Sequence, residues 1–324
     1  MKLLVTGAAG FIGAHLVKHL LAQDHQVVGI DNLNSYYSPE YKKLRLEKLV
    51  GNNPRFTFYS CDITDTRNLA QIFNENHFST VFHLAAQAGV RYSLTHPYIY
   101  EKNNILGTLN ILEQLKKSSK TKLIFASSSS VYGNSKNIPF SEKDNNLWPI
   151  SLYGVSKRSN ELMIKAYHEL YAIKAVCARF FTVYGPWGRP DMAYFIFTKN
   201  ILEDKKIEVF QLETQRDMTY IDDIIMGIDK ILNSDLDFEI INLGNSSPIK
   251  LEYLVNSIEK ISGKKASFTI ANLPKGDVKA TYADISLAKK LLGWAPTTSV
   301  YSGLEKFVSW FRKENLRQIS GINF

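Results

Sequence analysis

The stretch Lys2–Gly13, KLLVTGAAGFIG, limits most strongly what this chain can fold into. Its first part, Leu3–Thr6, suits a buried strand and runs directly into three glycines that open an apolar helix. A strand, a glycine turn and a helix in this order bind a pyrophosphate. The glycines allow a tight turn, a close approach of the backbone to the phosphates, and close packing of the helix on the strand. The helix N-terminus adds unpaired N–H groups and a partial positive charge. The stretch therefore predicts a dinucleotide site that begins with Gly7, Gly10, Phe11, Ile12 and Gly13.

An acidic residue downstream strengthens this prediction. A second apolar run, Val27–Ile30, ends in Asp31, about 18 residues after the last glycine of the turn. A carboxylate at this spacing accepts hydrogen bonds from an adenosine ribose and repels the 2′-phosphate of NADP, so NAD is the expected cofactor. The alternative is that Asp31 is an ordinary acid at the end of a strand, but the glycine turn before it favours the ribose contact.

Length and composition are those of a globular protein with room for two lobes. The chain has 324 residues, of which 45% are hydrophobic and 22% charged. No apolar run approaches the ~20 residues of a membrane helix, and a strand that begins at Lys2 leaves no room for a signal peptide. Cys61 and Cys177, the only two cysteines, lie in or beside apolar runs. We expect both to be buried thiols of a cytoplasmic protein.

The net charge of +8 does not predict a nucleic-acid partner, because the lysines are scattered and no aromatic platform accompanies them. The seven histidines show no ligand spacing and pair with no cysteine, so no metal site is expected. The densest basic groups, all expected at the solvent surface, are Lys42-Lys43-Arg45, Lys116-Lys117 and Lys264-Lys265.

Strands alternate with helices in the first half of the chain, which predicts an α/β fold with a doubly wound parallel sheet. Asp62 follows one of these strands and is placed to contact an adenine; the alternative, a helix N-cap, fits Asp65 better. Ala85-Ala86 follows another and is small enough for a cofactor to pass close to the backbone. The predicted elements are helices over Leu44–Val50 and Pro97–Lys117 and strands over Arg55–Ser60, Thr80–Leu84 and Lys122–Ala126.

The pattern becomes irregular after a strand over Ala175–Phe181 and a rigid loop over Gly185–Pro190. A helix near Ile221–Leu232, a strand near Glu239–Leu243 and a helix over Leu251–Ile261 follow. We expect a dinucleotide-binding domain over residues 1–180, with returns near 219–245, and a smaller mixed α/β lobe over 181–324.

A tyrosine and a lysine four residues apart, Tyr153 and Lys157, begin the next helix. At this spacing they lie on one helix face, about a turn apart. A nearby ammonium favours a phenolate, so we expect the tyrosine pKa to fall from ~10 toward neutrality, where it can act as a general base. Such a pair alone is usually just helix surface, but here it follows the serine run Ser127–Ser130 in a chain that begins with a dinucleotide turn.

These motifs resemble the extended short-chain dehydrogenase/reductase superfamily over nearly the whole chain. Within it the chain is most similar to UDP-glucuronate 4-epimerases. The fragments that carry this similarity are AGVRYS (Ala88–Ser93), SLYGVSK (Ser151–Lys157), RFFTVYGPWGRPDMAYF (Arg179–Phe195) and RDMTYIDDI (Arg216–Ile224).

The resemblance implies a Rossmann-type sheet, a smaller C-terminal substrate lobe and an NAD that stays bound. Tyr153 would take the proton of the sugar 4-hydroxyl while hydride leaves C4, and Ser128 would bond the same oxygen. Lys157 would hold the nicotinamide ribose, and the 4-keto sugar would rotate before hydride returns. The further cofactor contacts implied are Asn32, Asp62, Ile63, Leu84, Ala85, Ala86 and Asn103; for Asn103, packing alone is the alternative.

Glucuronate adds a hazard, because its 4-keto form is a β-keto acid that loses CO2 readily. Ser129, Ser130 and Thr182 are hydroxyl side chains placed to hold the carboxylate, although strand-end capping is an alternative for the serines. UDP-glucuronate decarboxylases carry Glu where this chain has Ser130, and UDP-galactose 4-epimerases carry Asn at the place of Thr182. Both remain alternatives, as does a non-catalytic NAD-binding sensor or scaffold.

Basic side chains complete the expected nucleotide-sugar site. Arg189 and Arg216 suit the pyrophosphate and sugar, since a guanidinium matches phosphate oxygens bidentately. Asp277 resembles the family's ribose-contacting acid. Arg91 is placed either near the substrate carboxylate or in a surface ion pair. The resemblance also implies a homodimer through the helices over 97–117 and 152–171. Its expected apolar residues are Tyr98, Ile99, Leu106, Leu109, Ile111, Leu112, Met163, Ile164, Tyr167 and Leu170.

Overall fold

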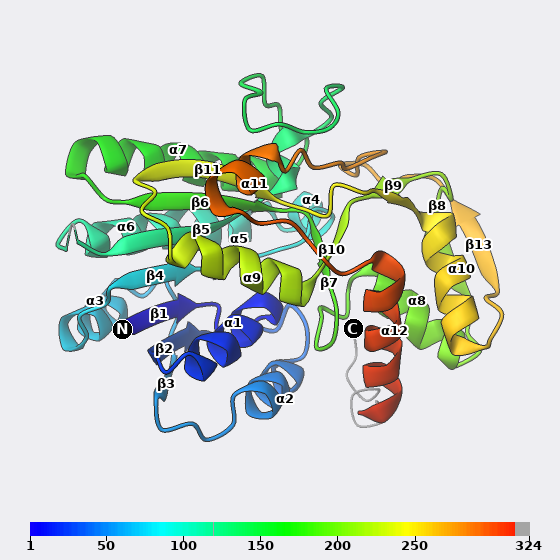
Figure 1. Ribbon diagram of the computed structural model, residues 1–324, viewed down its shortest axis with the longest axis horizontal. Coiled ribbons are helices and arrows are strands. Elements are labelled where there is room, and N and C mark those ends of the chain that lie inside the picture. The colour runs from blue at the N-terminus through cyan, green and yellow to red at the C-terminus, as the bar shows by residue number, and fades with distance from the viewer. Residues whose placement is uncertain (119, 315–324) are drawn as a thin grey trace.

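A seven-stranded sheet organises the larger part of the molecule in the computed structural model, which describes residues 1–118 and 120–314 (Figure 1). All its neighbouring strands pair in parallel, in the order β11-β6-β5-β4-β1-β2-β3. The chain order therefore reverses between β1 and β4, which makes the carboxyl ends of these two strands the expected place for a ligand. The strands are β1 (Lys2–Thr6), β2 (Gln26–Asp31), β3 (Phe56–Ser60), β4 (Thr80–His83), β5 (Lys122–Ser128), β6 (Ala175–Phe180) and β11 (Phe238–Leu243).

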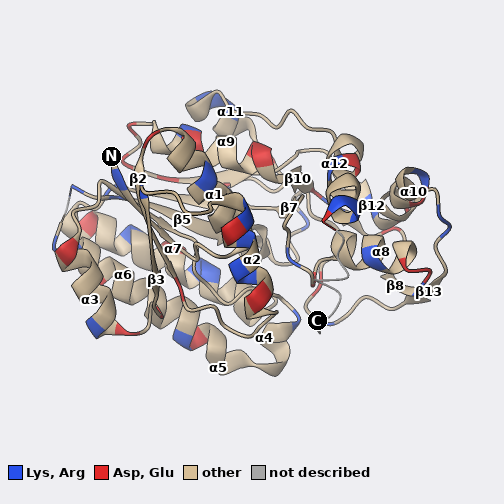
Figure 2. Ribbon diagram, turned by 90° about the horizontal axis from the view of Figure 1, so that it is seen from below, with Lys and Arg blue, Asp and Glu red and all other residues tan. Residues whose placement is uncertain are grey.

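Helices cover both faces of this sheet (Figures 1 and 2). One layer contains α1 (Phe11–Ala22), α9 (Ile221–Leu232) and α11 (Ser286–Leu292), and the other contains α3 (Thr66–Glu75), α6 (Gly107–Leu115) and α7 (Leu152–Tyr171). The arrangement is the doubly wound α/β fold that the alternation of elements predicts.

The strands are apolar on both faces because each face meets helices. In β5, Leu123 and Phe125 belong to one buried apolar cluster, while Ile124 and Ala126 belong to the other. A strand buried on both sides reads as a continuous apolar run rather than an alternation. The runs that sequence analysis assigns to strands are therefore explained by this two-sided burial.

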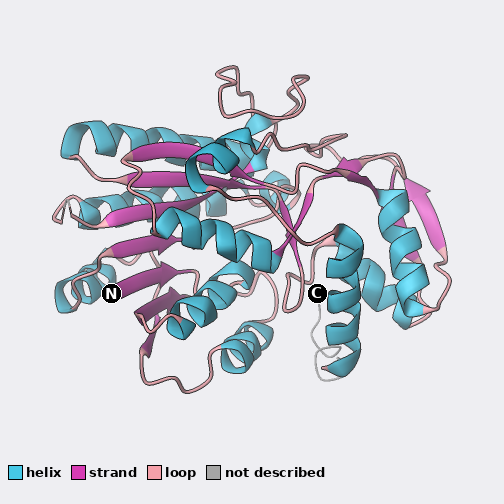
Figure 3. Ribbon diagram, viewed as in Figure 1, coloured by secondary structure: helices cyan, strands magenta, loops and turns pink. Residues whose placement is uncertain are grey.

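A smaller lobe stands beside the carboxyl ends of the strands (Figure 3). Up to residue 314, where the described part of the chain ends, it contains three two-stranded sheets and three helices. Its strands are β7 (Thr182–Tyr184) with β10 (Met218–Tyr220), β9 (Gln215–Arg216) with β12 (Ile249–Lys250), and β8 (Ile207–Phe210) with β13 (Phe268–Ala271). Its helices are α8 (Ala193–Leu202), α10 (Leu251–Ser262) and α12 (Val300–Lys313). The last ten residues of the predicted second lobe lie outside the described part of the chain.

The prediction for the helix after β2 was wrong at its start. Helix α2 spans Pro39–Leu49 rather than beginning at Leu44, because Ser38 accepts a hydrogen bond from Tyr41 N and a proline follows it at the first helical position. The surface prediction for its basic residues was also wrong. Lys42 and Arg45 are 5% and 0% exposed, and only Lys43 of the three faces solvent.

The predicted helix over Pro97–Lys117 is divided. A short turn α4 (Tyr92–Thr95) and α5 (Pro97–Tyr100) lead into a π-helical segment η1 (Glu101–Leu106), and α6 ends at Leu115. Segments of this kind are rare and frequently lie at functional sites. Both cysteines are free and buried, as predicted. Among the residues that the structure describes, none of the helices combines the length and apolar character required to cross a bilayer.

A buried ion pair joins α7 to β6. Arg179 Nε and Nη2 donate to the two carboxylate oxygens of Glu161 at 2.8 Å each. Ser127 Oγ and Arg158 Nη1 donate to the same carboxylate. Glu161 and Arg179 are each 1% exposed, so each charge depends on its partner.

We expect Glu161→Gln to lower the free energy of unfolding by about 3–5 kcal/mol, because it leaves the Arg179 guanidinium buried without a counter-charge. Urea unfolding followed by circular dichroism measures this change. Glu169→Gln, on the same helix in an exposed pair with Lys165, is the matched control and is expected to leave stability unchanged. Equal stability of the two variants would contradict the prediction.

Candidate active site

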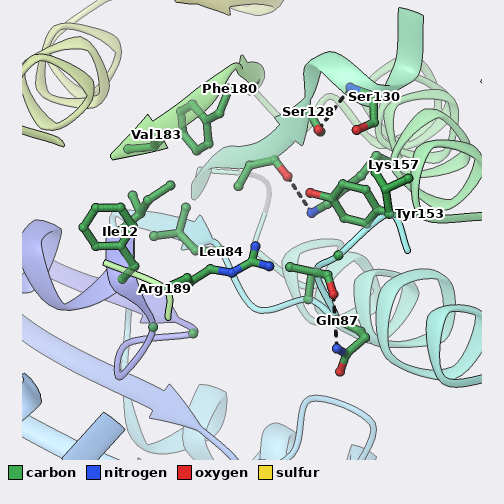
Figure 4. A pocket seen from close by; sticks show the side chains of 18 of the residues that line it. Ile12, Leu84, Gln87, Ser128, Ser130, Tyr153, Lys157, Phe180, Val183 and Arg189 are labelled. Atoms are coloured by element: carbon green, nitrogen blue, oxygen red, sulfur yellow. Dashed lines mark hydrogen bonds between the residues drawn. The ribbon is translucent and has the colours of Figure 1, made fainter. Parts of the chain in front are cut away.

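One cavity of about 400 Å³ opens where the strand ends of the large sheet meet the smaller lobe. The predicted site residues come from segments spread over the whole chain, and all of them except Arg91 line this cavity. Figure 4 shows the side chains of Tyr153 and Lys157 on one side, near Ser128 and Ser130, with Ile12 and Leu84 across the cavity. The sequence motifs are therefore brought together at a single place.

The glycine turn forms one end of the cavity. Gly7 has φ +72°, and a Cβ on Gly13 would lie 2.0 Å from the Gly7 carbonyl oxygen, so a side chain at residue 13 would push α1 away from the turn. Gly10 is the N-cap of α1 and supplies no side-chain cap, so the first N–H groups of the helix are left for an external acceptor. This uncapped helix end fits an anionic pyrophosphate.

Acidic groups follow the turn at the ends of β2 and β3. The Asp31 carboxylate accepts hydrogen bonds from Ala9 N at 3.1 Å and from Leu33 N at 2.8 Å, which fixes it beside the turn. Burial raises the pKa of Asp31, and these two bonds and the Lys42 charge oppose the rise. Asn32 Nδ2 donates to Asp62 Oδ2 at 2.9 Å. Such a group of acceptors suits the hydroxyls and amino group of an adenosine.

Asp62 does not have the helix N-cap role that was its alternative. Asp65 is the N-cap of α3 and accepts from Asn68 N at 3.1 Å. Asp62 instead accepts from the backbone and hydroxyl of Thr64 and lines the cavity with Ile63.

The helix that carries Tyr153 and Lys157 begins at the cavity wall. Ser151 caps it by accepting from Gly154 N at 3.1 Å. Lys157 is 3% exposed and its Nζ donates to the carbonyl oxygen of Ala126 at 2.7 Å. The Ser128 hydroxyl accepts from Ser130 N at 3.1 Å, and its interaction with the Tyr153 side chain favours the ionised phenol. The three predicted catalytic groups are therefore close together at the end of β5.

The prediction that Lys157 lowers the tyrosine pKa was wrong for this arrangement. Burial raises the pKa of Tyr153, while the Ser128 hydrogen bond and the charge of Arg189 oppose the rise. Burial also lowers the pKa of Lys157 to about 7, against the opposing charge of Glu161. An enclosed site penalises both ionised forms, and this cost exceeds the attraction expected from helical spacing alone.

Two adjacent asparagines of η1, Asn103 and Asn104, make different contacts. Asn103 lines the cavity, but the bonds that hold the backbone are made by Asn104. Its side chain accepts from Gln87 N at 2.7 Å and donates to Gln87 O at 3.1 Å and Ser156 Oγ at 2.9 Å. Asn104 was missed, since nothing in the sequence separates two adjacent asparagines within a π-helical segment.

The segment directly after β5 and the smaller lobe contribute the remaining predicted groups. Ser129, Ser130, Thr182, Arg216 and Asp277 all line the cavity. Arg91 does not; its Nη2 donates to Asp277 Oδ2 at 2.8 Å, and its guanidinium lies 4.3 Å from the ring centroid of Phe210. The structure thus places Arg91 in the ion pair that was the alternative to a substrate contact.

Apart from Asn32, the residues of the segment between β2 and α2 and of the first turn of α2 were not predicted to line the cavity. Tyr36, Tyr37 and Lys42 line the cavity, and Lys42 Nζ donates to Asn34 O at 2.6 Å. The wrong start of α2 hid these residues, because only a helix that begins at Pro39 turns Lys42 inward. In residues 1–118 and 120–314, His, Cys, Asp and Glu side chains form no group of three that could hold a metal ion.

Comparison with known proteins agrees with this geometry. A family model described as GDP-mannose 4,6 dehydratase matches residues 4–307. The chain is 46% identical over 321 residues to a UDP-glucuronate 4-epimerase of Thermodesulfobacterium geofontis, covering 98% of each.

Solved structures are similar as well. UDP-glucuronic acid 4-epimerase of Bacillus cereus, in complex with UDP-glucuronic acid and NAD, superposes with a TM-score of 0.91 at 39% identity, covering 97% of this chain and 100% of that one. UDP-glucose 4-epimerase of Thermotoga maritima, with UDP-glucose, gives a TM-score of 0.89 at 32% identity, with the same two coverages.

The lowered pKa of Lys157 predicts a pH dependence of stability. Between about 7 and the ordinary lysine value of 10.5, the unfolded chain binds a proton at this residue that the folded chain does not. The free energy of unfolding should therefore rise with pH in this window, by at most about 1.4 kcal/mol per pH unit. Urea unfolding at a series of pH values, compared with Lys157→Met, measures the contribution. Lys165→Met on the same helix should keep the wild-type slope, and an equal slope in Lys157→Met would refute the prediction.

Proposed function

The chain belongs to the GDP-mannose 4,6-dehydratase family, and from this premise we propose that it is an NAD-dependent 4-epimerase that interconverts UDP-glucuronate and UDP-galacturonate. The observation that carries the proposal is the grouping of Tyr153, Ser128 and Lys157 in one cavity with hydroxyl side chains at Ser129, Ser130 and Thr182. The similarity to two UDP-glucuronate 4-epimerases over nearly the full chain supports the choice of sugar.

The cavity has a place for NAD. The pyrophosphate would lie at the N-terminus of α1, and the adenosine at Asp31, Asn32 and Asp62. Bound NAD supplies a hydride acceptor for C4 of the sugar and returns the hydride later in the same cycle. The other residues proposed to contact it are Gly7, Gly10, Phe11, Ile12, Gly13, Ile63, Leu84, Ala85, Ala86, Asn103, Tyr153 and Lys157.

Tyr153 is the proposed base for the sugar 4-hydroxyl. The proton would leave this hydroxyl for the phenolate oxygen of ionised Tyr153 when hydride leaves C4, and it would return to the sugar oxygen when the 4-keto group is reduced. Ser128 lines the same cavity, favours the ionised phenol and is proposed to bond the sugar oxygen. Lys157, fixed by the Ala126 carbonyl, orients the ribose beside the tyrosine.

The hydroxyl groups near the strand end give the proposal its specificity. A β-keto acid loses CO2 when its carboxylate bond aligns with the carbonyl π system. Ser129, Ser130 and Thr182 can hold the carboxylate out of this alignment by neutral hydrogen bonds. Serine at residue 130 disfavours a decarboxylase, and threonine at residue 182 disfavours a neutral-sugar 4-epimerase. Arg189, Arg216 and Asp277 are proposed to bind the UDP half, with Arg91 holding Asp277.

The two lobes divide this work. We propose that residues 1–180, with returns near 219–245, form the NAD domain and that 181–324 form the nucleotide-sugar lobe. Helix α9 and strand β11 lie within residues 219–245. Strand β11 is an edge strand of the seven-stranded sheet, and α9 packs against that sheet. A cytoplasmic location is also proposed, since two free buried thiols are typical of reducing compartments.

A homodimer is proposed through the outer side of α5, η1, α6 and α7. Tyr98, Leu106, Leu162 and Leu170 are 85%, 40%, 56% and 70% exposed, more apolar surface than one helix pair normally leaves to water. Three residues expected there were placed wrongly, because Ile111, Leu112 and Ile164 are buried within the chain's own core.

Purified protein is expected to convert UDP-glucuronate to UDP-galacturonate without added oxidant, as followed by chromatography of the nucleotide sugars. Tyr153→Phe should lose activity by at least about 10³-fold while keeping its NAD, since only the proton acceptor is removed. A UDP-pentose as the sole product would instead assign a decarboxylase. Turnover of UDP-glucose alone would assign a neutral-sugar epimerase, and bound NAD without turnover a sensor or scaffold.

Light scattering at micromolar concentration should give twice the mass of one chain. The double substitution Tyr98→Asp and Leu170→Asp should lower this mass toward one chain, because it places like charges in the apolar contact. Ile270→Asp, which alters an exposed residue of β13 in the other lobe, is the control and should leave the mass unchanged. A monomer mass for the wild type would disprove the dimer.

A further inference from the structure

Arg189 is fixed in the cavity by two residues that the proposed function does not use. Its Nε and Nη2 donate to Asp191 Oδ1 and Oδ2 at 3.1 and 2.6 Å. The Tyr36 hydroxyl donates to Asp191 Oδ2 at 2.9 Å, and the guanidinium lies 5.8 Å from the Tyr36 ring centroid. Tyr36 follows β2, whereas Arg189 and Asp191 follow β7. The contacts therefore join the cofactor side of the cavity to the substrate side.

Helix α2 holds the loop that carries Arg189 in place by hydrogen bonds. Arg45, which is fully buried, donates through Nε to Trp187 O at 2.7 Å and through Nη1 to Ala9 O at 2.8 Å. Tyr41 OH donates to Gly188 O at 3.1 Å. Because Ala9 belongs to the glycine turn, this loop and that turn are fixed to the same helix.

A row of tyrosine rings continues from Tyr36 to the proposed base. The ring centroids lie 4.8 Å apart between Tyr36 and Tyr92, 6.4 Å between Tyr92 and Tyr100, and 6.2 Å between Tyr100 and Tyr153. Figure 4 shows the Arg189 side chain entering the cavity with its guanidinium toward the side where Tyr153 lies. The Arg189 guanidinium and the Tyr153 phenol therefore line the same cavity, and the tyrosine rings connect Tyr36 beside Arg189 to Tyr153.

Charged and titratable groups face Tyr153 from three elements. Lys157 comes from its own helix, and its Nζ is turned to the Ala126 carbonyl. Tyr100 comes from α5 and is uncharged at neutral pH, because burial raises the pKa of its phenol. Arg189 comes from the loop after β7, and its charge favours the ionised form of Tyr153.

We infer that Asp191 and Tyr36 are positioning residues that hold the Arg189 guanidinium toward Tyr153, so that Arg189 supplies positive charge for the phenolate. The inference deepens the proposed function, because it concerns the base of that reaction. It assigns a second task to an arginine otherwise expected only to bind the UDP half. The hydrogen-bonded carboxylate restricts the guanidinium to one direction, and the Tyr36 hydroxyl restricts the carboxylate in turn.

The direction in which the pKa of Tyr153 changes separates positioning of Arg189 from neutralisation of its charge. If Asp191 positions Arg189, Asp191→Asn lets the guanidinium turn away from Tyr153, and the pKa of Tyr153 rises. If Asp191 only neutralises Arg189, the same substitution leaves a stronger positive field and the pKa of Tyr153 falls. Tyr36→Phe changes no charge and removes only the hydroxyl that holds Asp191, so positioning predicts a rise there too.

The test is a pH titration of the Tyr153 ring by NMR, in the protein as purified with tyrosine labelled at the ζ carbon. The signal is assigned by its loss in Tyr153→Phe. We expect the pKa of Tyr153 to rise by about one unit in Asp191→Asn, and by less in Tyr36→Phe. Turnover of UDP-glucuronate should fall by about tenfold or more in Asp191→Asn, mainly in kcat.

Asp24→Asn is the matched control, because Asp24 forms an exposed pair with Arg55 far from the cavity; it should leave both measurements at the wild-type value. An unchanged or lowered pKa of Tyr153 in Asp191→Asn would overturn the inference. The titration needs no turnover, so a wild-type protein that fails to act on UDP-glucuronate would reject the proposed function while the titration still decides the role of Asp191. Thermal midpoints equal to that of the wild type show that the variants fold.

Discussion

The close packing of α1 on the glycine turn is the constraint on which the rest of the structure depends. Gly13 lies so near the Gly7 carbonyl that no side chain fits between them, and this contact sets the helix end at the tip of β1. The N–H groups of Gly7 and Ala8 both donate to Ile30 O, which joins the turn to β2. The turn thereby fixes the reversal point of the sheet, and the cavity opens at that point. Every other group of the site is positioned relative to this contact.

Burial is the second physical theme of the site, and it disfavours the charged forms of Asp31, Tyr153 and Lys157. It raises the pKa of Asp31 and Tyr153 and lowers that of Lys157, since each charged form loses solvation. The chain opposes this cost with specific partners: backbone N–H groups for Asp31, a carbonyl for Lys157, a hydroxyl and a guanidinium for Tyr153.

Much of this architecture follows from the sequence, and the failures have physical causes. The bounds of α9 and the strand that ends in Asp31 were predicted correctly, because apolar periodicity and glycine placement are local signals. The start of α2 was missed since a Ser-Pro cap, not an apolar run, begins it. Lys42 and Arg45 were expected in solvent because a basic cluster usually is. The carbonyl partners of Arg45 lie on distant segments that no local pattern reveals, while Asn34 and Tyr37, which bond Lys42 and Arg45, lie in the segment before α2. The predicted fall in the pKa of Tyr153 was wrong for the same reason, because burial is a property of the folded chain and not of helical spacing.

The return of the chain to the large sheet has a consequence for how such a molecule can be divided. Strand β11 pairs with β6 along its full length, from Phe238 opposite Ala175 to Leu243 opposite Phe180. A fragment cut after residue 180 would therefore expose the backbone groups of an apolar strand at an open sheet edge, which favours aggregation. The two lobes cannot be exchanged as independent modules by recombination. Changes in sugar preference must instead accumulate as single substitutions around a cavity that both lobes share.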